Sequence, residues 1–219
     1  MNSPITPYVE AHQLVYYDKD TFTISPVYKK YIKSILIPHG LILDRIEKLA
    51  EDIVDDFSSR NCKNIKMICA LKGAFLFFNE LSVRIENTIN KRDLKISLSH
   101  EFLKIKSYMN DKSTGKVHIS LTEQAVFTGE DVLLVDDIVD TGKTMNSFLE
   151  FIKKENPKST RVVSLLSKKL PEKTYMPEFT GFEIPEEFII GFGLDYNEHF
   201  RNFRHIAILN ELGINELKI

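Results

Sequence analysis

The sequence has little of the chemistry that marks disulfide-rich, zinc-binding or nucleic-acid-binding proteins. It holds two cysteines among 219 residues, and its formal net charge is only -2. Cys62 and Cys69 are close in sequence and the second falls in an apolar run, so we expect two reduced thiols and neither a disulfide nor half a zinc site. The small net charge predicts no general attraction toward nucleic acid.

Long hydrophobic runs are also absent. The most apolar stretch, residues 67–78, is too short to span a bilayer and is interrupted by Lys72. Residues 1–10 contain two prolines and no apolar segment of the length that a signal peptide needs. We therefore expect a cytoplasmic protein that does not associate with membranes.

What the sequence does contain is an alternation of helix and strand patterns. Apolar residues at three- and four-residue steps predict helices over residues 42–57, 74–85 and 145–153. Short apolar or alternating runs predict strands over residues 65–71, 94–102, 132–135, 161–166, 188–192 and 205–209. This alternation predicts the α/β class, with a doubly wound, mostly parallel sheet. The last two strands and the N-terminal segment are expected to form a small cap on that sheet.

One long segment fits neither pattern. Residues 104–116 are polar, include Gly115 and lack periodicity. Structureless stretches of this length in compact domains are usually lids or disordered segments. We therefore expect a loop here.

Residues 132–144 form the segment with the most residues capable of binding a ligand. Four apolar residues precede two carboxylates, and a short polar loop with Gly142 then leads into a helix. Ligands of open α/β sheets bind at the carboxyl ends of strands, and a glycine loop that opens a helix offers N–H groups suited to phosphate. Thr141 and Thr144 add hydroxyl donors and Lys143 adds charge, so the segment predicts a phosphate site.

A nucleoside-triphosphate loop is the first alternative for this segment. Its motif needs a glycine five residues before Gly142, and Asp137 stands there instead. Carboxylates beside a phosphate loop suit ribose hydroxyls and Mg²⁺ better. Since neighbouring strand residues point to opposite faces, one of Asp136 and Asp137 should meet the ligand, and the other is a structural partner or reaches the metal indirectly. The plain alternative is a solvated acidic strand end.

With these residues in view, the segment resembles the signature that binds 5-phosphoribosyl-1-pyrophosphate (PRPP) in the type I phosphoribosyltransferases. Further segments resemble the hypoxanthine-guanine phosphoribosyltransferases in particular and occur in the right order: residues 37–42, 71–73, 106–108, 181–185 and 194–198. The resemblance runs from about residue 16 to about residue 210. It implies the type I phosphoribosyltransferase fold, with a core of about residues 40–180, a hood from about 1–35 and 181–219, and a mobile flap at about 104–118. It also suggests a homodimer or homotetramer.

The resemblance implies a purine-salvage reaction with Mg²⁺ as cofactor. The 5-phosphoribosyl group of PRPP would pass to hypoxanthine or guanine, giving IMP or GMP and pyrophosphate. The implied substrate-binding residues are Lys72, Gly73, Ser107, Tyr108, Asp136, Asp137, Ile138, Val139, Asp140, Thr141, Gly142, Lys143, Thr144, Lys168, Phe188, Ile189, Asp195 and Arg201. The implied metal-binding residues are Asp195, Asp136 and Asp137.

Individual roles follow from the same resemblance. Asp136 and Asp137 would sit by the ribose hydroxyls, and residues 140–144 would wrap the 5-phosphate. Asp140 is the implied general base, which would take a proton from the imidazole ring of the purine. Its alternative role is to shape the loop by accepting bonds from backbone N–H groups.

The purine would be read by residues further along the chain. Lys168 would donate to the 6-oxo group, a choice that favours an oxo group over the amino group of adenine because lysine only donates. Phe188 would stack on the purine, although a phenylalanine in a strand is more often part of the core. Ile189 would serve the base through its backbone. Asp195 is implied near both the Mg²⁺ and the purine edge.

Pyrophosphate would be held by Arg201, with Arg204 nearby as an ordinary surface residue. Lys72 and Gly73 resemble the pyrophosphate loop of the family, in which the peptide between these two residues can be cis. Ser107 and Tyr108 resemble the flap that closes over the reaction centre and excludes water.

The chain departs from the family pattern at three positions. Asp136 stands where many relatives carry glutamate, and Ala74 stands where a second glycine is common; Gly193 precedes the 194–198 segment and is expected to loosen it. These departures leave open which base is preferred, xanthine included. The main alternative function is a PRPP- or nucleotide-sensing regulator on the same fold, which would not need the flap, Lys168 and Asp140 together.

Overall fold

The computed structural model describes the backbone of residues 4–107, 117–121 and 127–218, and the side chains of these residues except 104–107 and 117–121. Its strands are β1 (Ile32–Ile37), β2 (Asn64–Leu71), β3 (Ser97–Ser107), β4 (Val117–Leu121), β5 (Asp131–Val139), β6 (Ser159–Lys168), β7 (Phe179–Ile184), β8 (Ile189–Ile190) and β9 (Ile206–Leu209). Its helices are α1 (Pro26–Lys29), α2 (His39–Ser59), α3 (Phe75–Lys91), α4 (Lys143–Lys154) and α5 (Glu211–Glu216), with short 3-10 helices at Ala11–Gln13 and Lys19–Thr21.

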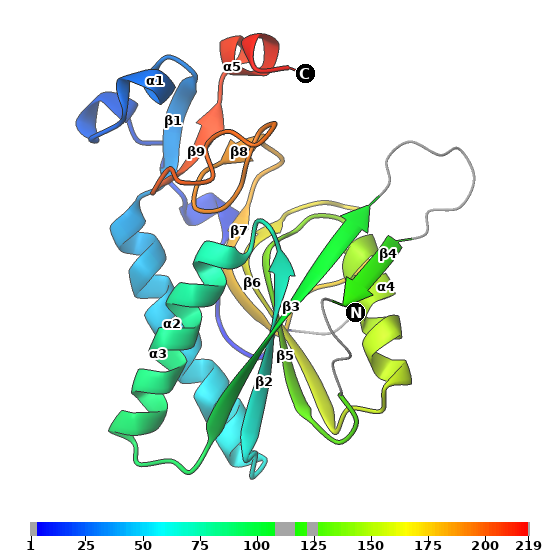
Figure 1. The fold of residues 1–219 in the computed structure, drawn as a ribbon. Coiled ribbons are helices and arrows are strands. Elements are labelled where there is room, and N and C mark those ends of the chain that lie inside the picture. The colour runs from blue at the N-terminus through cyan, green and yellow to red at the C-terminus, as the bar shows by residue number, and fades with distance from the viewer. Residues whose placement is uncertain (1–3, 108–116, 122–126, 219) are drawn as a thin grey trace.

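The large sheet has the strand order β4-β3-β2-β5-β6-β7 (Figure 1). Every neighbouring pair from β3 to β7 is parallel, and only the edge strand β4 runs antiparallel to its neighbour. The predicted α/β class with a mostly parallel sheet is therefore confirmed. Each predicted helix and strand of the core is present, although α3, β3 and β5 extend several residues beyond their expected ends.

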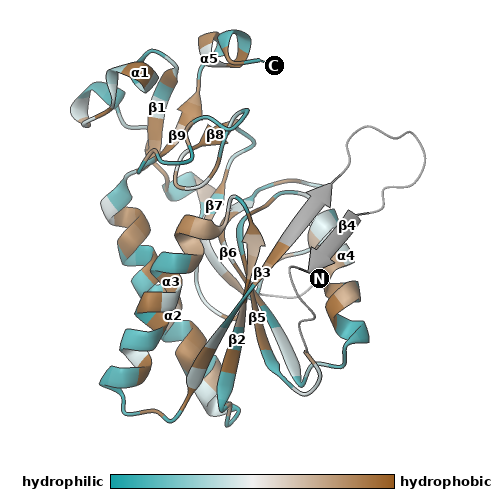
Figure 2. Cartoon of the chain, viewed as in Figure 1, coloured by the Kyte–Doolittle hydropathy of each residue, from teal (hydrophilic) through white to brown (hydrophobic). Residues whose placement is uncertain are grey.

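Helices cover both faces of this sheet, and β5 shows how the sequence divides between them. Leu133 and Val135 belong to the core under α2 and α3, whereas Val132 and Leu134 belong to the core under α4. Because side chains alternate along a strand, a run of four apolar residues contributes two side chains to the core on each face of the sheet. In Figure 2, apolar and hydrophilic positions alternate along α2 and α3, as expected for helices with one buried side.

The expected loop at residues 104–116 is partly wrong. Strand β3 continues to Ser107, and its last residues pair with β4 from Leu103 opposite Leu121 to Ser107 opposite Val117. Polar composition misled the prediction because hydrogen bonding to β2 and β4 supports a strand that its own sequence does not favour. Residues 108–116 of the expected flap, including Tyr108, lie outside the described residues.

A second sheet, of order β1-β9-β8, lies beyond the edge of the large sheet at which the parallel strands β2 and β3 end (Figure 1). It joins residues from near both ends of the chain around an apolar cluster that includes Ile32, Phe200 and Ala207. We call this sheet with its loops the hood. The expected hood boundary at residue 181 falls inside β7, which belongs to the large sheet. Among the described residues, no helix is long and apolar enough to cross a membrane.

Candidate active site

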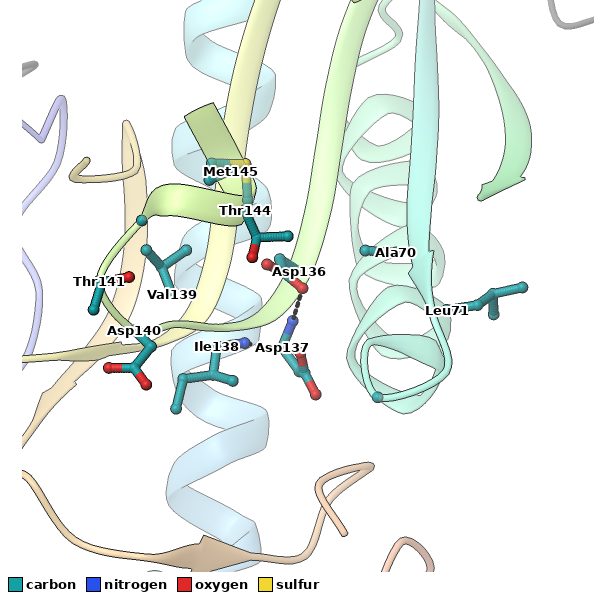
Figure 3. Close-up of a pocket in the computed structure, with 12 residues that line it drawn as sticks. Ala70, Leu71, Asp136, Asp137, Ile138, Val139, Asp140, Thr141, Thr144 and Met145 are labelled. Carbon is teal, nitrogen blue, oxygen red and sulfur yellow. Dashed lines mark hydrogen bonds between the residues drawn. The ribbon is translucent and has the colours of Figure 1, made fainter. Parts of the chain in front are cut away.

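A cleft opens at the carboxyl ends of β2 and β5. The sheet grows from β2 toward β3 on one side and toward β5 on the other, so the order in which strands are added reverses between the parallel neighbours β2 and β5. Ligands of doubly wound folds bind at such a switch point. The cleft is lined by Ala70, Leu71, Gly73, Asp136, Asp137, Ile138, Val139, Asp140, Thr141, Gly142, Thr144 and Met145 (Figure 3). The structure therefore brings the predicted phosphate segment and the predicted Lys72-Gly73 loop to one place.

The loop after β5 is held in a shape suited to an anion. Gly142 has φ +86° and immediately precedes α4, so the unpaired N–H groups of the first helical turn lie beside the loop. A Cβ atom on Gly142 would lie 2.7 Å from Cβ of Tyr175, which leaves no room for a side chain. From outside, Thr174 donates both its N–H and its hydroxyl to the carbonyl of Thr141, each at 2.8 Å. The phosphate loop is thus fixed by backbone geometry.

Asp136 and Asp137 both line the cleft, from opposite sides. Asp136 lies toward Thr144 and Met145, whereas Asp137 lies toward the loop after β2 (Figure 3). The predicted alternation holds. Both carboxylates line the cleft, and which of them meets the ligand stays a prediction. Asp137 approaches Gly73 so closely that a Cβ there would lie 1.8 Å from the carboxylate.

The surroundings of the two carboxylates disfavour their charged forms. Burial, reinforced by the charge of Asp137, raises the pKa of Asp136 well above its usual range, and burial also raises the pKa of Asp137. Backbone groups donate to both: the Asp137 N–H donates to Asp136 at 3.1 Å and the Ile138 N–H to Asp137 at 3.0 Å. Neither carboxylate forms an ion pair within the described part of the chain. Half-buried carboxylate oxygens of this kind are the donor set that a hard divalent cation such as Mg²⁺ fits.

The three predicted metal residues do not form one cluster. Across the described ranges, no group of three or more His, Cys, Asp or Glu side chains gathers closely enough to hold a metal ion. Asp195 lies in the hood loop, where its Oδ1 is 2.8 Å from Nη2 of Arg201. A magnesium ion at Asp136 and Asp137 would therefore take other ligands from water or substrate, as Mg²⁺ commonly does.

Asp140 and Lys168 face each other across the ends of β5 and β6. Their Oδ2 and Nζ atoms are 3.7 Å apart. Lys168 ends β6, and its carbonyl accepts a hydrogen bond at 3.0 Å from Nζ of Lys173, which also donates to the Ser167 hydroxyl. The sequence predicted Asp140 and Lys168 as site residues but not Lys173. The contacts of Lys173 with Ser167 and Lys168 depend on the fold of the loop after β6.

Phe188 and Ile189 lie in the hood, outside the set of residues that line the cleft. The side chain of Phe188 is 45% exposed, so it is not the core phenylalanine of the alternative interpretation. It meets Tyr196 edge-on, with ring centroids 5.2 Å apart and an interplanar angle of 90°. Ile189 is buried in β8. An exposed ring of this kind is available for stacking on a flat ligand.

The predicted pyrophosphate residues form an ion network with a residue that the sequence interpretation missed. Nζ of Lys72 lies 3.3 Å from each carboxylate oxygen of Glu198. Arg201 donates to the same carboxylate from Nε at 3.3 Å and from Nη2 at 3.1 Å. Glu198 lies three residues before Arg201, at the end of the 194–198 segment, and that spacing was the available signal. Arg204 is exposed, in line with its expected surface role.

Two expectations about the loops need correction. The cis peptide lies between Leu71 and Lys72, one bond before the expected Lys72–Gly73 peptide. Gly193 does not act as a loosening residue: a Cβ there would lie 2.0 Å from the carbonyl oxygen of Gly73, and its own N–H donates to the carbonyl of Arg201 at 2.9 Å. Glycine is required because the hood loop and the loop after β2 touch backbone to backbone. Ser107 is placed only as a residue at the end of β3.

Comparison with known proteins identifies the family. A phosphoribosyl transferase domain matches residues 34–197. Hypoxanthine-guanine phosphoribosyltransferases from Sus scrofa and Homo sapiens are 42% and 41% identical over 199 residues, which span 90% of this chain and 90% of each relative. The chain belongs to the hypoxanthine-guanine phosphoribosyltransferase family. The family and the enzyme class predicted from the sequence are thereby confirmed.

Solved structures agree with this assignment. The hypoxanthine-guanine phosphoribosyltransferase of Schistosoma mansoni, in complex with IMP, superposes with a TM-score of 0.81 at 34% identity, over 95% of this chain and 97% of that one. A hypoxanthine phosphoribosyltransferase of Trypanosoma cruzi in a ternary substrates complex gives 0.75 at 28% identity, over 84% and 98%. The phosphoribosyltransferase fold extends over nearly the whole molecule.

Proposed function

We propose that this enzyme transfers the 5-phosphoribosyl group of PRPP to hypoxanthine or guanine in purine salvage, forming IMP or GMP and pyrophosphate. The observation that carries the choice of base is the 3.7 Å pair of Asp140 and Lys168. A 6-oxopurine protonated at N7 presents a donor and an acceptor side by side on one edge. Asp140 accepts and Lys168 donates, so the pair complements that edge, whereas adenine offers an amino donor at the position facing Lys168.

The ribose phosphate half of PRPP fits the β5 end of the cleft. The N–H groups and hydroxyls of residues 140–144 take the 5-phosphate at the start of α4. Asp136 and Asp137 accept hydrogen bonds from the ribose hydroxyls. This half of the substrate is therefore bound by the least deformable part of the site.

Magnesium would be held by Asp136 and Asp137, with Asp195 as the candidate from the hood. When bound, the ion supplies charge neutralisation to the departing pyrophosphate. Arg201, Lys72 and Gly73 bind the pyrophosphate oxygens, since a planar guanidinium matches paired phosphate oxygens. Phe188 stacks on the purine, and Ile189 contacts it through backbone groups.

The transfer itself exchanges one bond at the anomeric carbon. The bond from that carbon to the pyrophosphate oxygen breaks with its electron pair, and the N9 lone pair of the purine forms the new bond. The N7 proton passes to Asp140, which leaves the purine neutral. Ser107 and Tyr108, on the proposed flap, exclude water from the cationic transition state. A cytoplasmic homodimer or homotetramer is part of the same proposal.

An ultraviolet absorbance assay tests this function. Enzyme, PRPP and Mg²⁺ are mixed with hypoxanthine, guanine, xanthine or adenine in separate reactions. The expected result is Mg²⁺-dependent nucleotide formation with hypoxanthine and guanine and none with adenine. If no base reacts while PRPP binds tightly, the reaction is wrong and the sensing regulator takes its place.

A further inference from the structure

Glu198 places a negative charge against Lys72 and Arg201, the two cations that bind pyrophosphate in the proposed function. Lys72 and Arg201 come from different parts of the fold, the loop after β2 and the hood loop. Glu198 bridges them with both carboxylate oxygens, at 3.3 Å from Lys72 and at 3.1 and 3.3 Å from Arg201. A carboxylate with two oxygens on two cations occupies the positions that an anionic ligand would need.

The backbone holds Glu198 in this position at a conformational cost. Asn197, Glu198 and Phe200 all have positive φ, at 50°, 64° and 72°. The N–H of Glu198 donates to Oδ2 of Asp195 at 2.8 Å, and Asn197 donates to the carbonyl of Leu217 at 2.8 Å. L-residues rarely adopt these angles, so the surrounding contacts rather than local preference place the carboxylate over the two cations.

The contact is also easily exchanged. The side chains of Lys72 and Glu198 are 62% and 63% exposed, and ion pairs in such surroundings are weak. Hydrogen bonds from Arg201 and Lys72 lower the pKa of Glu198, so it is an anion at neutral pH. Pyrophosphate carries several negative charges and can displace a single carboxylate, but it must first break the Glu198 contacts.

We propose that Glu198 is an internal competitor for the pyrophosphate subsite, which weakens the hold of the enzyme on pyrophosphate and so favours release of this product. The proposal rests on the proposed function, because it takes Lys72 and Arg201 as the pyrophosphate ligands. Glu198 acts through these two residues and not on the reacting atoms, so it is a positioning residue. Its loss should affect the pyrophosphate end of the site and leave the purine end unchanged.

Pyrophosphate binding tests the proposal. Wild type, Glu198→Gln, Glu198→Asp and the control Glu51→Gln are titrated with magnesium pyrophosphate by calorimetry, and pyrophosphate inhibition against PRPP is measured in the same proteins. Glu51 forms an exposed ion pair with Lys48 on α2, so its substitution removes the same charge outside the cleft. Glu198→Asp keeps the charge but is too short to span both cations, which separates the bridge from the net charge and provides a second variant if Glu198→Gln folds poorly.

Glu198→Gln should bind pyrophosphate about three- to tenfold more tightly, the range for loss of two exposed ion pairs. Glu198→Asp should lie between it and wild type, Glu51→Gln should match wild type, and KM for hypoxanthine should not change. Equal or weaker pyrophosphate binding in Glu198→Gln would overturn the proposal, because Glu198 would then be inert or would orient Arg201 for its ligand. If wild type binds pyrophosphate but converts no base, the proposed function is wrong. The calorimetric comparison of wild type with Glu198→Gln would still test the role of Glu198 in pyrophosphate binding.

Discussion

The sheet side and the hood side of the candidate site are built in different ways. On the sheet side, Asp136, Asp140 and Lys168 sit at or just beyond the ends of buried parallel strands, and Gly142 is fixed by the backbone around it. On the hood side, Glu198 and Arg201 lie in a loop of irregular backbone and exposed ion pairs. The sheet side presents fixed groups, whereas the hood side presents groups that exchange partners.

This difference matches the two tasks of the proposed reaction. The ribose phosphate and the purine edge must be held in one geometry while a bond forms between them, and a rigid frame supplies that. Pyrophosphate must be bound and then released, and weak, exchangeable contacts suit that purpose. Substitutions on the sheet side should therefore impair chemistry or stability, and substitutions on the hood side should shift product affinity.

The largest expected effect is the loss of kcat when Asp140 is replaced. Asp140→Asn removes the proton acceptor and keeps the shape, so kcat should fall by about 10²–10⁴ with PRPP affinity largely retained. Rates measured at saturating PRPP and hypoxanthine, with PRPP binding measured by calorimetry, provide the check. Asp93→Asn is the matched control, since Asp93 forms an exposed pair with Lys95. Wild-type kcat in Asp140→Asn would show that this residue only shapes the loop.

A glycine series tests the rigidity of the phosphate loop. Gly142→Ala combines left-handed strain with a clash against Tyr175, so the free energy of unfolding should fall by more than about 2 kcal/mol and KM for PRPP should rise. Thermal denaturation and PRPP saturation curves measure the two effects.

Two other glycines separate strain from clash. Gly129 has φ +74°, and a Cβ added there would meet no atom within 4 Å, so Gly129→Ala should lose only about 1–2 kcal/mol through strain. Gly40 has open space and no such angle, and Gly40→Ala should leave stability unchanged or raise it. Equal stability losses at Gly142 and Gly129 would mean that the contact with Tyr175 does not matter.

The smallest expected effect concerns charge on the sheet side. Because burial raises the pKa of Asp136, the folded protein holds that proton more tightly than the unfolded chain does. Its ionisation therefore destabilises the free protein above the raised pKa, and this penalty disappears as the pH falls toward the ordinary value near about 3.9. Asp136→Asn should raise stability at neutral pH by about 1 kcal/mol while it lowers Mg²⁺-dependent activity.

Asp131 offers the opposite case. Burial alone would raise its pKa, but hydrogen bonds from Lys158 and Ser159 outweigh that effect and lower it. Asp131 therefore adds stability above its ordinary pKa, and this contribution is lost as the pH falls through the lowered value. Asp131→Asn should lower the melting temperature at neutral pH. Melting curves between about pH 4 and pH 8 test both variants, and a lower melting temperature in Asp136→Asn at neutral pH would contradict the account of its charge.

The sequence predicted the sheet side better than the hood side for a physical reason. Strand β5 and its loop can be recognised from a short stretch of sequence, in which apolar residues are followed by carboxylates and Gly142. The partnership of Glu198 with Lys72 joins residues far apart in the chain, and only the tertiary fold brings them together. The same holds for Gly193 against Gly73, which local reasoning took for a source of looseness. Strand β3 escaped prediction at its end because its partners, not its own residues, support it.

The most direct test of the account asks whether Lys168 reads the 6-oxo group. kcat/KM is measured for hypoxanthine and for purine, which lacks that group, in wild type and in Lys168→Met. The account predicts that wild type prefers hypoxanthine by about 10- to 100-fold, the worth of a hydrogen bond to a charged group, and that Lys168→Met loses this preference with pyrophosphate inhibition unchanged. The same preference in both proteins would contradict the proposed reading of the purine edge.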